Sequence, residues 1–289
     1  MQVLLQVKDL NVSYRGAASS QRRAVENVSF EIAEGEVLGL MGESGCGKTS
    51  VALALLGLLS KDLAHVSGSI QFRGKELLST DQRSLRAIRG AGISLVFQEP
   101  ELALSPVMKI RDQVAEVIHA HNDWNWQRCR TEAELALARV GLANSPRIFS
   151  AYPHQLSGGQ RQRVVLAQAL ACNPALLIAD EPAASLDARS QSELLALLRV
   201  LQRELHISIL LISHAPEVQA SLADRLMVMA NGRIVEQGPF EQLYRNPSHV
   251  CTRAMLRTAA AAGVPENLDL EMVTSMLIAP RRKNDKGRE

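Results

Sequence analysis

Hydrophobic and polar positions alternate along the first part of the chain, which is the pattern of half-buried β-strands. The stretches LLQVKDLNVSY and RAVENVSFEIAEGEVLGLM carry it, with breaks at Gly16 and at EGE (34–36). VSGSIQFRG (66–74) and ISLVF (93–97) indicate further strands. Later, ALLIAD (175–180) and ISILLIS (207–213) are nearly unbroken apolar runs, as expected for parallel strands buried on both faces.

Helical spacing of apolar residues separates these strands. It is present in KTSVALALLGLL, LSGGQRQRVVLAQALAC and SQSELLALLRVLQREL. Strands that alternate with helices predict an α/β fold, with a mostly parallel sheet and right-handed crossovers. RLMVMANGRIVEQG (225–238) predicts a hairpin that turns at Asn231–Gly232 and adds an antiparallel part.

The pattern becomes purely helical from about residue 100 to residue 160. VMKIRDQVAEVIHAH and CRTEAELALARVGL have helical spacing, with no strand pattern between them. We therefore expect a helical subdomain inserted into an α/β domain of residues 1–240. Residues 241–289 then form a C-terminal helical extension and a tail that we expect to be disordered, since its last ten residues carry five basic and two acidic side chains.

Composition limits the possible environments of the chain. A net charge of +2 gives no argument for a nucleic-acid partner. The four cysteines have no paired or zinc-like spacing, so we expect reduced thiols in a cytosolic protein. No signal peptide and no apolar run of about twenty residues is present, so a protein acting at a membrane would be held there by other chains.

The octapeptide GESGCGKT follows a predicted strand and opens a predicted helix, which is the context of a phosphate-binding loop. Backbone N–H groups of such a loop cradle an anion, with Lys48 placed for the β- and γ-phosphates and Thr49 for Mg²⁺. A chance glycine-rich turn is the alternative. The candidate ATP-binding residues here are Gly42, Glu43, Ser44, Gly45, Cys46, Gly47, Lys48, Thr49 and Ser50; the Cys46 thiol itself is given no chemical role.

Two acids end a buried strand in LLIADEP (176–182). A phosphate loop needs a neighbouring carboxylate to hold its metal, and buried acids are costly without such a use. Asp180 is the predicted Mg²⁺ residue, and Glu181 is predicted to orient and deprotonate the attacking water. Two exposed loop acids remain the alternative.

The chain resembles the ATP-binding subunits of ABC transporters over residues 1–240. The resemblance rests on an ordered set of motifs: Tyr14, GESGCGKT, Gln98 of FQEP, LSGGQ (156–160), LLIADEP with SLD (185–187), and His214 of ISH. It implies a P-loop NTPase core of the ABC ATPase type, ATP and Mg²⁺ as cofactors, and ATP hydrolysis.

In that family two domains pack head to tail, and the LSGGQ segment of each caps the ATP of the other. The resemblance assigns this role to Ser157, Gly158, Gly159 and Gln160, which open a helix and so form an anion-binding end. An N-cap serine followed by two flexible glycines is the alternative, and it explains only the start of the helix.

The remaining roles follow from the same resemblance. Gln98 contacts Mg²⁺ and the attacking water, and His214 bonds the γ-phosphate. Asp187 acts across the dimer interface, and Tyr14 stacks on adenine. Without the resemblance, His214 would be a surface residue and Tyr14 an aromatic residue that ends a strand.

Several stretches resemble the importers of dipeptides, oligopeptides and nickel, including YPHQLSGGQRQRV and RNPSHVCTRAML. Val250 and Cys251 stand where that subfamily has Pro and Tyr, and EPAASLD lacks its usual threonines. Only Cys251 lies where some relatives carry a cysteine cluster, so no iron–sulfur centre is expected. HAHNDWNWQRCR (119–130) is interpreted as an interhelical loop and not as a nickel site.

The resemblance also implies partners and a location. These are integral membrane permease subunits, a second ATPase subunit (a related chain more than an identical one), and indirectly an extracytoplasmic substrate-binding protein. The chain would lie at the cytoplasmic face of the inner membrane, with Leu102 and Leu104 as candidate permease contacts. Two other classes remain as alternatives: a soluble ABC-type ATPase acting on nucleic acid or ribosomes, and a P-loop kinase or small GTPase, which explains neither LSGGQ nor His214.

Overall fold

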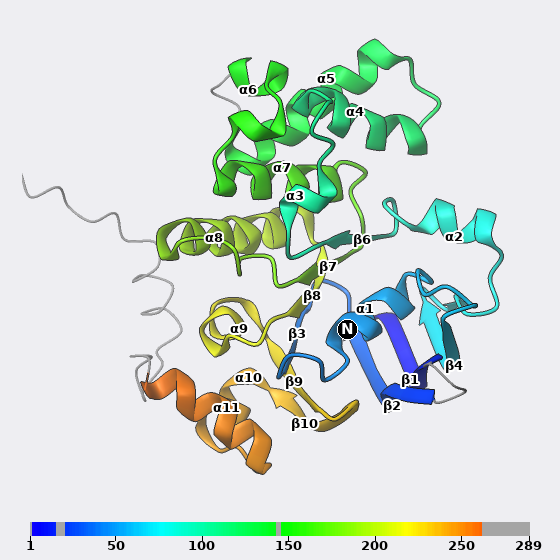
Figure 1. The fold of residues 1–289 in the computed structure, drawn as a ribbon, viewed down its shortest axis with the longest axis vertical. Helices are drawn as coiled ribbons and strands as arrows, with labels where there is room; N and C mark the ends of the chain where they lie inside the picture. Colours follow the sequence, from blue (N-terminus) through cyan, green and yellow to red (C-terminus); the bar gives the residue numbers. More distant parts are fainter. Residues whose placement is uncertain (1, 16–20, 143–145, 262–289) are drawn as a thin grey trace, which may run out of the picture.

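A six-stranded sheet lies at the centre of the computed structural model, which describes residues 2–15, 21–142 and 146–261 (Figure 1). The strand order is β10-β9-β3-β8-β7-β6, parallel throughout except for β10. This confirms the predicted mostly parallel sheet with an antiparallel part. The strands are β3 (Val37–Gly42), β6 (Ile93–Val96), β7 (Leu176–Asp180), β8 (Ser208–Ile212), β9 (Arg225–Ala230) and β10 (Arg233–Pro239).

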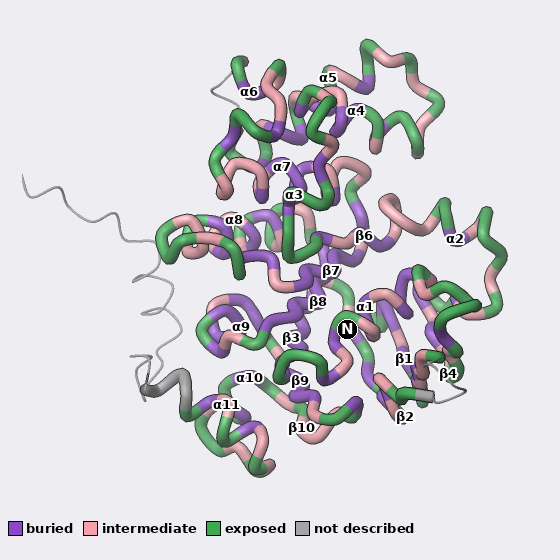
Figure 2. The backbone as a smooth tube through the Cα atoms, in the orientation of Figure 1, coloured by how far each residue is buried: buried purple, intermediate pink, exposed green. Residues whose placement is uncertain are grey.

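The central strands are the unbroken apolar runs of the sequence. Every residue of β3, β7 and β8 is buried, because helices or a second sheet cover both faces (Figure 2). Burying one Leu or Ile side chain contributes about 1.5–3 kcal/mol, so the strands are held mainly by packing. One apolar cluster joins the sheet to the inserted helices and another joins it to the second sheet.

A separate antiparallel sheet of order β2-β1-β4-β5 packs beside the central one. Its long strands follow the alternating stretches of the sequence, with β1 pairing to both β2 and β4. The two-residue β5 and the nearby helix α2 were not predicted, because short elements carry little periodic signal. The strands are β1 (Val3–Arg15), β2 (Gln21–Ala33), β4 (Ala64–Phe72) and β5 (Lys75–Glu76).

The hairpin between β9 and β10 turns where the sequence predicted. Asn231 and Gly232 have φ angles of 49° and 80°. Positive φ at both central residues is the requirement of a type I′ turn, which Asn-Gly satisfies well. This prediction is confirmed.

The described residues between β6 and β7 form helices and no strand, as the helical pattern predicted (upper part of Figure 1). These helices are α3 (Pro100–Ala103), α4 (Ile110–His121), α5 (Trp126–Leu137), the π-helical turn η2 (Ala138–Leu142), α6 (Pro146–Ser150), the 3₁₀ turn η3 (Pro153–Gln155) and α7 (Gly158–Leu170). The helices outside this segment and before the C-terminal part are α1 (Lys48–Leu55), α2 (Gln82–Ile88), α8 (Ala188–Leu205) and α9 (Pro216–Leu222).

Two helices follow the hairpin, α10 (Phe240–Arg245) and α11 (Val250–Ala261). The Glu236 carboxylate accepts hydrogen bonds from the backbone N–H groups of Ser248 (2.8 Å) and His249 (3.0 Å), just before α11. A negative charge there satisfies N–H groups at the start of a helix. The predicted disordered tail lies outside the described residues.

Candidate nucleotide-binding site

Four chain segments meet at the carboxyl edge of the central sheet. The phosphate loop follows β3, residues 213–214 follow β8, Asp180 ends β7, and Gln98 comes two residues after β6. Because β3, β8, β7 and β6 are adjacent and parallel, their carboxyl ends lie at one edge. The topology therefore brings together residues that are far apart in the sequence.

Two glycines of the phosphate loop, Gly42 and Gly47, leave no room for a side chain. Gly47 has φ +114°, and a Cβ there would lie 2.3 Å from the carbonyl oxygen of Ala24. Lys48 is buried, and its ammonium donates to the carbonyl oxygens of Gly42 (2.7 Å) and Glu43 (2.9 Å). The loop thus wraps around its own lysine at the start of α1.

The Thr49 hydroxyl donates to a carboxylate oxygen of Asp180 at 2.9 Å. Burial raises the pKa of Asp180, and neighbouring Glu181 adds to this, while the bond from Thr49 opposes it. A hydroxyl and a carboxylate oxygen are hard ligands of the type that Mg²⁺ prefers, and a divalent cation would offset the cost of this buried charge. These residues therefore fit the predicted metal.

Glu181 is held on both carboxylate oxygens. One oxygen accepts from the backbone N–H of His214 (2.9 Å) and lies 2.6 Å from its ring Nδ1, and the other accepts from the Ser213 hydroxyl (3.0 Å). The backbone of Glu181 has φ 48°, a region that non-glycine residues rarely occupy. Sequence reasoning missed Ser213, for which the only signal was its place directly before His214.

Gln98 is exposed, and the segment that follows it is tied to the LSGGQ helix. Glu101 of α3 pairs with Arg161 of α7 at 2.9 Å, and Arg161 also donates to the carbonyl oxygen of Leu156 at 2.8 Å. Leu102 is 82% exposed. Leu104 is only 4% exposed, because its side chain packs into the core of the helical subdomain. The prediction of Leu104 as a surface contact is therefore wrong.

Tyr14 and Asp187 each have a partner within the chain. The Tyr14 hydroxyl lies 3.0 Å from the Ser50 hydroxyl on α1, so this aromatic residue is next to the phosphate loop. Asp187 caps α8, accepting from the N–H groups of Arg189 (3.1 Å) and Ser190 (3.0 Å), and the hydrogen bonds from Ser190 lower its pKa. This capping role was not predicted.

The LSGGQ segment opens α7 with a capping box. Ser157 Oγ accepts from the N–H of Gln160 (3.3 Å), and Gln160 Oε1 accepts from the N–H of Ser157 (3.0 Å). A Cβ at Gly158 would meet only Leu186 at 3.9 Å, and one at Gly159 would meet Ser190 at 3.4 Å. Both are tolerable contacts, so the chain itself does not require glycine at these two positions.

The two glycine-containing segments do not join one another in the described chain. Among residues 2–15, 21–142 and 146–261, no hydrogen bond or ion pair links residues 156–160 to residues 42–50. In Figure 1, α7 lies among the inserted helices, whereas α1 lies beside β3 on the opposite side of β6 and β7.

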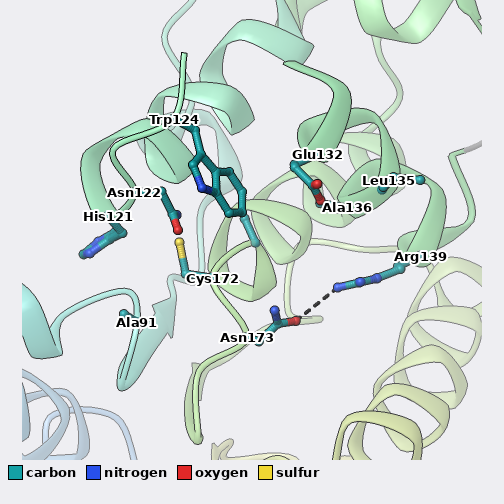
Figure 3. A pocket seen from close by; sticks show the side chains of 11 residues that line it. Ala91, His121, Asn122, Trp124, Glu132, Leu135, Ala136, Arg139, Cys172 and Asn173 are labelled. Atoms are coloured by element: carbon teal, nitrogen blue, oxygen red, sulfur yellow. Dashed lines mark hydrogen bonds between the residues drawn. The ribbon is translucent and has the colours of Figure 1, made fainter. Parts of the chain in front are cut away.

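The segment of residues 119–130 is only partly a loop. His119 and His121 lie in the last turn of α4, and α5 already begins at Trp126, so the loop covers only the middle of the segment. A pocket of about 160 Å³ lies there, with Arg139 and Asn173 joined by a hydrogen bond of 3.1 Å (Figure 3). It lies near the amino ends of β6 and β7, away from the phosphate loop.

The fold matches solved ATP-binding cassettes. The dimeric structure of a post-hydrolysis state of the ATP-binding cassette MJ0796 bound to ADP and Pi matches with a TM-score of 0.72 and 27% identity, covering 82% of this chain and 98% of that one. CbiO1 from Clostridium perfringens, described as part of the transporter complex cbiONQ, has a TM-score of 0.71 and 28% identity, covering 90% of this chain and 98% of that one. Fold and site together define a P-loop ATPase of the cassette type.

A family profile described as ABC transporter matches residues 25–184. The chain therefore belongs to the ABC transporter family, as one of its ATP-binding domains.

Two curated relatives are similar over most of this chain. The glutathione import ATP-binding protein GsiA of Escherichia coli strain CFT073 is 40% identical over 92% of this chain and 44% of its own length. The peptidoglycan transport ATP-binding protein YejF of Agrobacterium fabrum is 43% identical over 93% of this chain and 49% of its own length. The chain thus spans less than half the length of these relatives. No helix within its described residues is both long and apolar enough to cross a bilayer.

Proposed function

We propose that this chain hydrolyses ATP to energise an ABC importer of dipeptides or oligopeptides. The observation that carries the proposal is the meeting of Lys48, Thr49, Asp180, Glu181 and His214 at one edge of the sheet. The names of the relatives, for glutathione import and peptidoglycan transport, favour a peptide cargo over nickel.

Each residue then has a defined task at the phosphates. The N–H groups of the phosphate loop and the Lys48 ammonium bind the β- and γ-phosphates. Thr49 and Asp180 would hold Mg²⁺, with Gln98 nearby, and the ion would neutralise charge on the phosphate oxygens. Glu181 orients the attacking water and accepts its proton, held in place by Ser213 and His214. His214 also reaches the γ-phosphate, and Tyr14 stacks on the adenine.

The site is completed by a second ATPase subunit, either a related or an identical chain. Gly158 and Gly159 are small although their own chain leaves room for a larger residue. A close approach of backbone to an outside ligand is a use for such glycines. Ser157, Gly158, Gly159 and Gln160 therefore cap the γ-phosphate of a partner's ATP, with Asp187 at the same interface.

Other chains hold the ATPase at the cytoplasmic face of the inner membrane. Leu102 (82% exposed), Val107 (80%) and Phe97 (43%) are exposed apolar side chains within ten residues of Gln98 in the sequence, and such side chains suit contact with a permease subunit. A substrate-binding protein on the other side of the membrane delivers the cargo. Residues 1–240 act as the ATPase domain, with the helical subdomain at about 100–160, and residues 241–289 as its extension.

Co-purification and transport test this proposal. The chain should co-purify with integral membrane proteins, and cells lacking it should lose uptake of labelled peptides but not of Ni²⁺. Complementation with the chain should restore uptake, whereas its Glu181→Gln variant should not. Association with ribosomes or nucleic acid, without membrane partners, would instead support the soluble ABC-type ATPase.

A further inference from the structure

Gln219 of α9 is a fully buried polar side chain that no part of the proposed mechanism uses. It is 0% exposed, and its Nε2 group donates to the carbonyl oxygens of Leu211 (3.2 Å), Ser213 (3.2 Å) and Leu40 (3.4 Å). An amide has two N–H hydrogens, so three acceptors share them. One side chain thus gathers carbonyl groups from two neighbouring strands.

The other end of the amide has no partner among the described residues. Gln219 Oε1 lies over Gly39, where a Cβ would be 2.2 Å from it. A buried, unpaired acceptor destabilises a fold relative to an apolar side chain of the same shape. Stability alone therefore does not account for a glutamine at this position. The hydrogen bonds that its Nε2 group donates are the better explanation.

The carbonyl groups that Gln219 holds belong to β3 and to β8 with the residue that follows it, two of the four strands that lead into the site. Leu40 is in β3, which leads into the phosphate loop, and Ser213 directly precedes His214. The N–H of Ser213 donates to Leu40 at 3.2 Å, and the Ser213 hydroxyl donates to Glu181 at 3.0 Å. Gln219 thus fixes the turn that presents His214 and Ser213 to Glu181.

The helix that carries Gln219 is itself anchored. Ala220 and Ala223 pack in an apolar cluster with Leu226 of β9 and Phe240 of α10. The Arg199 guanidinium of α8 also donates to the carbonyl oxygen of Ser221 at 3.0 Å. The amide is therefore a fixed point against which the turn after β8 is held.

We propose that Gln219 is a positioning residue for ATP hydrolysis, fixing the Ser213–His214 turn relative to the phosphate-loop strand. This inference rests on the proposed roles of His214 and Glu181. Removing the amide should let the turn shift without disturbing Lys48 or Thr49, so that turnover falls while nucleotide binding persists.

Gln219→Met in the full chain tests this, because Met has a similar length but no donor. We expect kcat to fall by about 10- to 100-fold, as small misplacements of reacting groups do. ATP affinity should stay within about twofold, because the phosphate loop is untouched. A folded Gln219→Met variant with wild-type kcat would overturn the proposal.

A second pair of variants separates positioning from packing. Gln219→Ala leaves a cavity, which Gly39→Ala partly refills, because a Cβ at Gly39 would lie 2.2 Å from Gln219 Oε1; the flexible end of Leu226, at 2.9 Å, must then move slightly. The double variant should regain thermal stability relative to Gln219→Ala but keep the low kcat. Wild-type turnover in the double variant would mean that Gln219 only fills space, and the proposal would be wrong.

A double-mutant cycle with His214 shows which proposal fails. If Gln219 acts through His214, then Gln219→Met should add little to His214→Ala. If the fold losses of kcat in the two single variants multiplied fully in the double variant, the inference would be contradicted. If His214→Ala loses turnover but Gln219→Met keeps it, only the inference about Gln219 is wrong. If His214→Ala keeps wild-type turnover, the proposed role of His214 is wrong, and the inference about Gln219 fails with it.

Discussion

The chain contains two glycine-containing helix starts, and they differ in what requires the glycines. In the phosphate loop, a Cβ at Gly42 would lie 2.4 Å from the carbonyl oxygen of Met229, and one at Gly47 would lie 2.3 Å from that of Ala24. In the LSGGQ segment, Gly158 and Gly159 have room for a Cβ. The first pair is required by the folded chain, and the second is not.

In the proposed composite site, this difference separates the half that the chain completes by itself from the half that a second molecule would complete. Around the phosphate loop, Lys48 donates to carbonyl oxygens of the loop itself, and Thr49 joins the loop to Asp180. The capping box of the LSGGQ segment pairs the N–H groups of Ser157 and Gln160 with side-chain oxygens, but the N–H groups of Gly158 and Gly159 have no intrahelical acceptor. A second molecule that brings a phosphate to this helix end accounts both for the room beside Gly158 and Gly159 and for the N–H groups that have no acceptor.

The largest expected effect on turnover concerns the half of the ATP site that the chain completes by itself. Glu181→Gln should lower kcat by about 10²- to 10⁴-fold, the range that a general base contributes, while ATP binding and dimer closure persist. Phosphate release and gel filtration with ATP measure this. Glu217→Gln on α9 changes an exposed acid and serves as the control; near-normal turnover in Glu181→Gln would remove Glu181 from the base role.

The next effect tests the comparison itself. Gly158→Ala should leave thermal stability equal or higher, because Ala has the better helix propensity and a Cβ there meets only Leu186 at 3.9 Å, but lower turnover by about 100-fold by crowding the partner's nucleotide. Gly47→Ala should instead destabilise the protein. Thermal melts and ATP turnover of both variants measure this. Equal loss of stability in the two variants would erase the distinction between the two helix starts.

Lys48→Ala should weaken ATP binding by about 10- to 100-fold, because a hydrogen bond to a charged group is worth about 1.5–3 kcal/mol. Calorimetry with the full chain measures the affinity. Lys61→Ala, which changes a lysine outside the phosphate loop, is the control. Unchanged affinity in Lys48→Ala would contradict the assignment of residues 42–49 as the phosphate cradle.

The smallest effect is on stability and depends on pH. Because burial raises the pKa of Asp180, the folded chain binds more protons than the unfolded chain between the ordinary and the raised pKa. The Asp180 carboxyl therefore lowers the stability of the folded chain as pH rises from its ordinary pKa to its raised pKa. Above the raised pKa the full loss of stability is present. Asp180→Asn should raise the melting temperature at neutral pH by about 2 °C, with no gain below the ordinary pKa.

Melting temperatures across pH, measured without nucleotide, check this prediction. Asp62→Asn is the control, because it changes an exposed aspartate that caps no helix. The Asp180 variant should also lose the extra stabilisation that Mg²⁺ gives with ATP. A lower melting temperature at neutral pH would contradict a buried, costly carboxylate.

The sequence predicted what local pattern determines and missed what depends on distant contacts. The strands, the Asn231–Gly232 turn and the phosphate loop follow from residues adjacent in the chain. The burial of Leu104, the bond from Ser213 to Glu181 and the network of Gln219 depend on segments that meet only in the folded protein. Asp187 was assigned to an interface, yet its cap on α8 was readable from the helix start that follows it.

The central claim is that a working site needs the phosphate loop of one molecule and the LSGGQ segment of another. The most direct test is ATP turnover per chain, measured over a range of concentrations at which mass determination gives the oligomeric state. The account predicts almost no turnover from monomers, and turnover that appears with dimers of this chain or of this chain with a related ATPase. Full turnover by a verified monomer, unaffected by Gly158→Ala, would contradict it.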